Sequence, residues 1–114
     1  MNQSVLTGFI CRDARLYQTD DGTSTTEFTL AVKRKLSRET DYIPCVARGC
    51  VAEHIVSKTR KGDKIGVAGR IEAPSWTDDD GTKRCRIYVM VHEVDLPPIK
   101  KEDRPFIQEK IPEI

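Results

Sequence analysis

The segment DYIPCVARGCVAEHIVSKTRKGDKIGVAGRI, residues 41–71, changes its hydrophobic period twice. Residues 41–49 alternate between the two sides of an extended chain, which predicts a β-strand. Residues 51–60 instead repeat apolar side chains at i, i+3, i+4 and i+7, which predicts a helix of about ten residues with Gly62 as its C-cap. Residues 65–71 then return to strict alternation. The segment therefore predicts two strands separated by one helix.

Three more strands are predicted outside this segment, at residues 5–11, 23–32 and 84–94. Gly8, within the first of them, indicates a bend or a close approach of another backbone. Turns rich in aspartate and ending in glycine precede the second and the fifth strand of the chain. The core-facing residues expected from alternation are Phe28, Leu30 and Val32 in one strand and Cys85, Ile87, Val89 and Val91 in the other.

This order of elements is that of the OB-fold, an all-β, five-stranded barrel with one short helix between strands 3 and 4. Another antiparallel five-stranded arrangement is the alternative, but a single helix at this place favours the OB-fold. We expect one domain over residues 1–96 and a short mobile C-terminal tail over residues 97–114. The fold presents a groove across strands 2 and 3, flanked by the loops that join strands 1–2 and 4–5. Because OB-folds also bind oligosaccharides and proteins, the fold alone does not define the function.

Several classes of protein are disfavoured by the sequence. No run approaches the ~18 consecutive apolar residues of a membrane span, and no signal peptide is visible, so we expect a cytoplasmic protein. No glycine-rich phosphate loop and no Ser/His/Asp grouping occurs, so we expect neither catalysis nor a cofactor. The run Asp78-Asp79-Asp80 lies in a predicted turn, where three adjacent side chains cannot all converge on a metal. We expect these carboxylates to be solvated.

The cysteines are spread along the chain and form no Cys-x-x-Cys pair. His54 and His92 complete no zinc-binding spacing with them. We therefore expect no metal site and four buried, reduced thiols. They are Cys11, Cys45, Cys50 and Cys85.

The net charge of +1 conceals a basic centre, because residues 33–61 carry eight basic and three acidic side chains. A solvated charged face is the ordinary explanation, and a local site for anions is the alternative. Aromatic side chains lie among these cations on the predicted non-core faces. Unpaired nucleic acid requires this mixture, since bases stack on aromatic rings while Lys and Arg contact phosphates. The candidate contacts are Phe9, Lys33, Arg34, Lys35, Tyr42, Arg48, Arg60, Lys61, Trp76, Arg84, Arg86 and Tyr88.

Short matching pieces follow one another from residue 2 to residue 96. They are Leu6-Thr7-Gly8, Arg12-Asp13, Phe28-Thr29-Leu30-Ala31-Val32, Cys45-Val46-Ala47, Arg60-Lys61-Gly62, Gly69-Arg70-Ile71 and Trp76-Thr77-Asp78 with Gly81. In order and spacing the chain resembles the bacterial and phage single-stranded-DNA-binding proteins. The resemblance implies sequence-tolerant binding of single-stranded DNA in replication, recombination and repair. It also implies base stacking on Tyr42 and Trp76, phosphate contacts at Arg60-Lys61, and assembly as a homo-oligomer, usually a tetramer.

The sequence departs from this family pattern at three places. Leu36 stands where the family often has Trp or Phe, and Arg48 stands where strand 3 often has another aromatic residue. We expect weaker stacking, partly offset by the guanidinium of Arg48, and therefore unusually salt-sensitive binding. The segment 99–114 ends in Ile-Pro-Glu-Ile instead of an acidic tip, so recruitment of replication proteins through the tail is not expected. The alternative function is an OB-fold protein-interaction or replication-restart accessory module with weak or no binding of single-stranded DNA.

Overall fold

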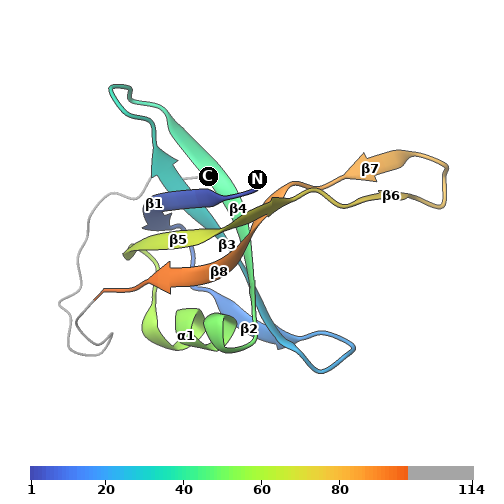
Figure 1. The fold of residues 1–114 in the computed structure, drawn as a ribbon, viewed down its shortest axis with the longest axis horizontal. Coiled ribbons are helices and arrows are strands. Elements are labelled where there is room, and N and C mark those ends of the chain that lie inside the picture. The colour runs from blue at the N-terminus through green and yellow to red at the C-terminus, as the bar shows by residue number, and fades with distance from the viewer. Residues whose placement is uncertain (98–114) are drawn as a thin grey trace.

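The computed structural model describes residues 1–97 and consists mainly of strands, with one helix (Figure 1). The elements in chain order are β1 (Ser4–Ile10), β2 (Arg15–Gln18), β3 (Ser24–Lys33), β4 (Thr40–Arg48), α1 (Cys50–Lys58), β5 (Lys64–Glu72), β6 (Ser75–Thr77), β7 (Lys83–Cys85) and β8 (Tyr88–Asp95). Apart from Pro97, the predicted tail of residues 97–114 lies outside the described residues. Within residues 1–97 no helix is long and apolar enough to cross a membrane.

Five of these strands form a closed ring in the order β1–β5–β8–β4–β3. The ring closes because the end of β1 pairs with β3, through Phe9 with Ala31 and Ile10 with Leu30. One seam of the ring is parallel and short: three residues of β4, Cys45–Ala47, pair with Val89–Val91 of β8. The other pairings are antiparallel. The predicted OB-fold barrel, with one helix between its third and fourth strands, is confirmed.

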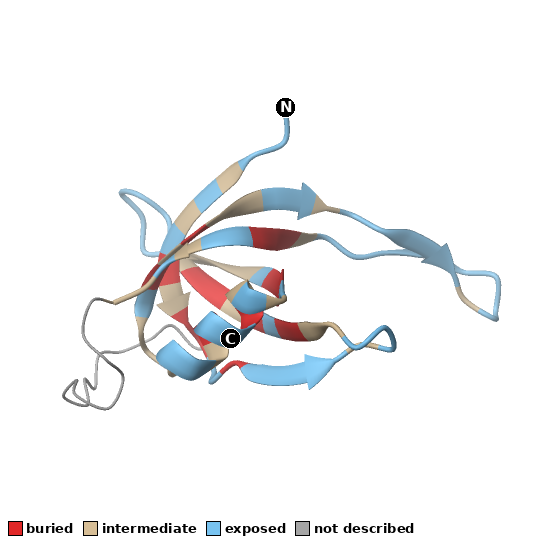
Figure 2. Ribbon diagram, turned by 60° about the horizontal axis from the view of Figure 1, so that its bottom comes forward, coloured by how far each residue is buried: buried red, intermediate tan, exposed pale blue. Residues whose placement is uncertain are grey.

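The core lies inside the ring and against α1 (Figure 2). Phe28 and Leu30 of β3 are buried there, as their alternation predicts, and Val32 is partly buried. Ala52 and Ile55 of α1 cover one end of this core. Burial of these apolar side chains is the main source of stability, at about 25 cal/mol for each Å² removed from water.

Two glycines allow strands of the barrel to approach closely. A Cβ atom at Gly8 would lie 2.5 Å from the backbone oxygen of Ala31, which confirms the predicted close approach. A Cβ atom at Gly69 would lie 2.0 Å from the backbone oxygen of Met90. Gly69 also follows a register shift in the pairing of β5 with β8. The obstacle at both glycines is backbone, which cannot move aside as a flexible side chain can.

The predicted fifth strand, residues 84–94, is wrong in its extent. β7 pairs with β6 in a separate two-stranded hairpin that projects from the barrel, and β8 alone joins the ring (Figure 1). Cys85 and Ile87 are therefore exposed, although alternation placed them in the core. Residues 84–94 pair with β6 in their first part and with barrel strands in their second part. Side-chain alternation does not reveal such a change, because it does not depend on which strand is the neighbour.

The end of the helix also differs from the prediction. α1 ends at Lys58, and Thr59 turns to an extended conformation while its backbone N–H and hydroxyl donate to the Ile55 carbonyl at 3.1 and 2.5 Å. Gly62 is not the C-cap; it has φ 98° in the following turn and donates its N–H to Ile10 at 2.9 Å.

The cysteine prediction is right for two residues and wrong for two. Cys11 and Cys45 are buried, whereas Cys50 at the start of α1 and Cys85 at the end of β7 are exposed. All four are free thiols. Burial raises the pKa of Cys45 to about 12.

Candidate nucleic-acid interface

The register of the strands defines one surface on the side of β3 and β4 that faces away from the core. Directly paired residues of neighbouring strands point to the same side of a sheet. We call this surface the outer face. Its residues are Thr25, Glu27, Thr29, Ala31 and Lys33 of β3, Tyr42, Pro44, Val46 and Arg48 of β4, Arg15 and Tyr17 of β2, Phe9 of β1, and Tyr88 and Met90 of β8.

Three predicted contacts meet at one end of the outer face. Phe9 and Tyr42 both pair with Ala31, from opposite sides, so two aromatic rings flank a small side chain. The ammonium of Lys33 lies 5.4 Å from the centroid of the Phe9 ring, which is a cation–π distance. Both aromatic side chains are half-buried, so part of each ring is accessible to a ligand while the rest packs against the protein.

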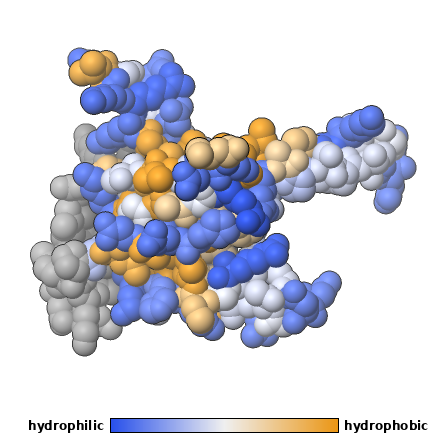
Figure 3. Space-filling view, in the orientation of Figure 1, coloured by the Kyte–Doolittle hydropathy of each residue, from blue (hydrophilic) through white to orange (hydrophobic). Residues whose placement is uncertain are grey.

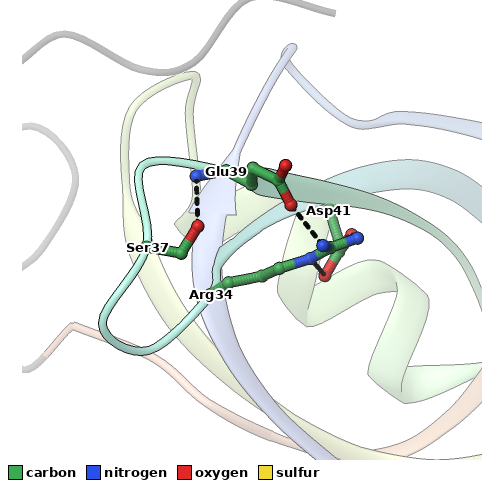
Figure 4. Close-up of polar contacts among 4 residues, drawn as sticks. All are labelled: Arg34, Ser37, Glu39 and Asp41. Atoms are coloured by element: carbon green, nitrogen blue, oxygen red, sulfur yellow. Dashed lines mark hydrogen bonds and ion pairs between the residues drawn. The ribbon is translucent and has the colours of Figure 1, made fainter.

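Arg34, in the loop between β3 and β4, is held by one carboxylate of the loop and one of β4 (Figure 4). Arg34 donates from Nη2 to Asp41 at 2.9 Å and from Nε at 3.0 Å, and it forms an ion pair with Glu39. The guanidinium lowers the pKa of Asp41. Lys35 and Leu36 lie beyond this cluster and are exposed. The loop therefore presents Lys35 to an incoming phosphate more readily than Arg34.

A second aromatic group lies where β8 begins. The Arg86 guanidinium sits 5.0 Å from the centroid of the Tyr88 ring and forms an ion pair with Glu27 of β3. The Tyr88 hydroxyl donates to Glu72 at 3.0 Å, and Arg70 pairs with Glu72 at 2.7 Å. The pKa of Tyr88 is raised, mainly by loss of hydration and less by this hydrogen bond. The pKa of Glu72 is lowered, mainly by its hydrogen bond from Arg70 and less by that from Tyr88. Arg86 and Tyr88 thus form a cation–π pair.

A cleft of about 800 Å³ lies between the outer face and the turn that follows α1. We call it the basic cleft, because four cations and two carboxylates line it. The full lining is Arg12, Asp13, Arg15, Glu27, Phe28, Thr29, Pro44, Cys45, Lys61 and Arg86. Neither Arg12 nor Arg15 was among the predicted contacts, although Arg12-Asp13 was one of the matching pieces of sequence. Within residues 1–97 these two arginines form no ion pair.

The predicted pair Arg60-Lys61 lies in the turn after α1 and not in the helix. Its two members have different surroundings. The Lys61 backbone N–H donates to Asp13 at 2.6 Å, which leaves its exposed side chain at the wall of the basic cleft. Arg60 is half-buried, and its backbone N–H donates to Asp63 at 2.9 Å. Lys61 is therefore the better placed of the two for a phosphate in the cleft.

The projecting hairpin carries Trp76 and Arg84 as directly opposed residues of β6 and β7. Trp76 is 45% exposed, and its indole N–H donates to Asp78 at 3.0 Å. Arg84 forms an ion pair with the other oxygen of Asp78. On the face shown in Figure 3, hydrophobic side chains gather over the barrel, and hydrophilic ones cover the far end of the hairpin and the β3–β4 loop except for a hydrophobic group at the tip of that loop.

The structure thus brings some of the predicted contacts together and leaves others apart. Phe9, Lys33, Tyr42, Arg48 and Tyr88 share the outer face, and Lys61 and Arg86 line the basic cleft. Trp76 and Arg84 lie on the separate hairpin, Arg34 and Lys35 in the β3–β4 loop, and Arg60 in the turn after α1. Three of the predicted arginines, Arg34, Arg84 and Arg86, are paired with carboxylates of this same chain. In residues 1–97 no three His, Cys, Asp or Glu side chains are grouped closely enough to hold a metal ion.

Comparison with known proteins gives a consistent family assignment. The family model of the single-strand binding protein family matches residues 1–97. Single-stranded DNA-binding protein 2 of Clostridium acetobutylicum is 39% identical over 99 residues, covering 82% of this chain and 74% of the relative. The single-stranded DNA-binding proteins of Clostridium tetani and Clostridium perfringens are 39% and 37% identical, over 68% and 65% of their own lengths. This chain belongs to the single-strand binding protein family.

Proposed function

We propose that this protein binds single-stranded DNA with little sequence preference, through residues 1–96, and that it acts by binding and not by catalysis. The observation that carries the proposal is the outer face, where register places Phe9, Tyr42 and Tyr88 on the same side as several cations. The relatives named single-stranded DNA-binding proteins support it. The role follows from this activity: protection and organisation of single strands during replication, recombination and repair, in the cytoplasm.

Two kinds of contact would hold the strand. Bases stack on exposed rings, each stack contributing about 1–3 kcal/mol, and every base has a face suited to this. Phosphates contact Lys and Arg, and these contacts weaken as salt rises. The cations with no ion pair in residues 1–97 include Lys33, Arg48 and Lys61.

The ion-paired arginines change what is expected of salt sensitivity. A phosphate that contacts Arg86 shares its guanidinium with Glu27, and one that contacts Arg34 competes with Asp41 and Glu39. Their gain on binding is smaller than that of a free cation, because a carboxylate of this chain already offsets part of their charge. We therefore assign most of the salt dependence to the free cations of the outer face and the basic cleft.

We further propose that the protein assembles with copies of itself, with a tetramer favoured. In the described residues Ser4–Gly8 of β1 pair only with β5, because pairing of β1 with β3 begins at Phe9. One edge of this stretch is therefore open, and Val5 within it is 79% exposed. An open strand edge is a template for pairing with another chain. A light-scattering mass equal to one chain would contradict this proposal.

The direct test uses Trp76, the single tryptophan of the chain. Oligo-dT is added at low salt while tryptophan fluorescence is followed, and the titration is repeated at increasing salt. Quenching that saturates, and that requires more oligonucleotide as salt rises, supports the proposal. A duplex of equal length and oligo-U serve as controls for strand state and sugar. Absence of both quenching and a gel shift at low salt would contradict the proposal and favour a protein-interaction module.

A further inference from the structure

Asp78 uses both of its carboxylate oxygens on the two functional side chains of the projecting hairpin. Oδ1 accepts the indole N–H of Trp76 at 3.0 Å, and Oδ2 accepts from Nε of Arg84. Trp76 and Arg84 are direct cross-strand partners, so they lie on the same face of the hairpin. One carboxylate therefore fixes an aromatic ring and a guanidinium beside each other.

The side chain of Asp78 is not needed to form the turn. The turn is closed by backbone bonds, from the Asp78 N–H to Thr82 and from the Gly81 N–H to Asp78, both at 2.9 Å. A neighbouring side chain, that of Asp80, accepts the Thr82 N–H at 2.9 Å. The geometry of the turn thus leaves the Asp78 carboxylate available for Trp76 and Arg84.

An exposed ring without such a contact would be poorly ordered. Trp76 is absent from the core cluster, and its strand β6 is exposed at all three positions. Immobilising a side chain on binding costs about a factor of two to ten in affinity. A ring that is already held avoids this cost, and the neighbouring guanidinium offsets the repulsion between the carboxylate and a phosphate.

We propose that Asp78 is a positioning residue that holds the Trp76 ring, with Arg84 beside it, ready to stack on a base. The inference rests on the proposed function, because it assumes that Trp76 contacts single-stranded DNA. Electrostatic repulsion alone predicts that removing a negative charge from the hairpin strengthens DNA binding, and the proposal predicts the opposite for Asp78. Removing this negative charge from the hairpin weakens binding, whereas removing the adjacent charge does not.

The experiment compares Asp78→Ala with Asp79→Ala, which removes the same charge from the next residue. Asp79 is exposed and forms no hydrogen bond or ion pair with any residue of 1–97, so it is a matched control. We expect Asp78→Ala to weaken oligo-dT binding about three- to tenfold, an effect that persists at high salt. We expect Asp79→Ala to tighten it about twofold at low salt and to lose this effect as salt screens the charge.

A second readout needs no DNA. Time-resolved fluorescence anisotropy of the free protein reports how freely the indole moves, and we expect faster local motion of Trp76 in Asp78→Ala but not in Asp79→Ala. Asp78→Asn keeps an oxygen that can accept the indole N–H, so its anisotropy decay should stay close to that of the wild type. If Asp78→Ala disturbs the hairpin, Asp78→Asn still tests the proposal, because indole motion faster than in the wild type would contradict it.

The outcomes separate the two proposals. If the wild type fails to bind oligo-dT, the proposed function fails, whatever the anisotropy shows. If the wild type binds but Asp78→Ala and Asp79→Ala change affinity equally, the positioning role is wrong. Unchanged indole motion in Asp78→Ala, or motion in Asp78→Asn as fast as in Asp78→Ala, would overturn it as well.

Discussion

The barrel and the projecting hairpin are built from strands but are held together by different forces. In the barrel, each strand has a neighbour on both sides along at least part of its length, and side chains such as Leu30 and Val67 are almost completely buried. In the hairpin, β6 and β7 have three residues each, and all six are exposed. Backbone pairing of β6 with β7 and the backbone bonds of the turn take the place of a core there, and Asp78 adds side-chain contacts. Stability thus resides mainly in one region, while an aromatic contact can be changed in the other without unfolding the protein.

The two regions also offer different contacts to a nucleic acid. The barrel supplies the basic cleft, where Arg12, Arg15 and Lys61 face the same space. The hairpin supplies a ring whose attraction for a base does not depend on counterions. Salt should therefore weaken the contribution of the barrel and leave that of the hairpin largely intact.

The largest expected effect separates the two regions by stability. Gly69→Ala places a Cβ 2.0 Å from a backbone oxygen, so we expect a loss of about 3 kcal/mol or more. Gly81→Ala meets no atom within 4 Å and suffers only from the positive φ of 84°, at a cost of about 1–2 kcal/mol. Thermal unfolding followed by circular dichroism measures both. Equal losses would show that the hairpin is as important to stability as the barrel.

A smaller effect separates the regions by function. Trp76→Ala should weaken binding of single-stranded DNA by about 1–3 kcal/mol and leave the melting temperature unchanged, because the ring contributes nothing to the core. Tyr42→Ala, in the barrel, should lower both the affinity and the melting temperature. Fluorescence anisotropy of a labelled oligonucleotide measures the affinity of the variant without tryptophan. Unaltered affinity in Trp76→Ala would place this residue outside the site.

The salt dependence distinguishes cleft from hairpin more finely. Lys61→Ala and Arg12→Ala should each make the slope of log K against log salt shallower by about 0.7, the value for one phosphate contact on a single strand. Arg60→Ala should change the slope less, because this half-buried residue does not line the cleft. Trp76→Ala should not change the slope. Identical slopes in wild type and Lys61→Ala would remove Lys61 from the phosphate path.

The smallest expected effect on the protein comes from labelling its thiols in the folded state at pH 8 to 10, which compares the accessibility of cysteines in the two regions. Cys85 in the hairpin and Cys50 in α1 are exposed and should react quickly. The thiol of Cys45 stays protonated, and therefore unreactive, until the pH approaches its pKa of about 12, provided that the fold holds. Counting the rapidly reacting thiols with a chromogenic disulfide reagent tests this. Cys85→Ser should remove one rapid equivalent, and rapid labelling of Cys45 would show that the barrel opens.

The sequence predicted those elements whose side chains alternate between core and solvent. β3 and β5 have this property, and α1 has the corresponding helical repeat. The positions of all three were correct to within one or two residues. β2 was missed because all four of its residues are exposed, so no alternation marks it. The break at Arg86-Ile87 was missed because alternation continues through a change of strand partner.

The candidate site was predictable to a similar degree. Tyr42, Arg48 and Trp76 lie on exposed or half-buried surfaces, as their places in the strands suggested. The ion pair of Arg86 could not be anticipated, because Glu27 lies on a strand distant in the sequence. The basic cleft likewise requires segments that are remote from each other along the chain.

The short parallel seam between β4 and β8 has a consequence for how the protein is made. The chain leaves the ribosome from its N-terminus, and Cys45–Ala47 must wait for Val89–Val91, which follow α1, β5 and the whole hairpin. Until then both β4 and β5 present an unpaired edge beside apolar side chains, the arrangement most prone to association with other chains. A nascent chain that ends before residue 89 cannot close its ring. Folding is therefore expected to be completed only late in synthesis, when the last strand of the barrel emerges.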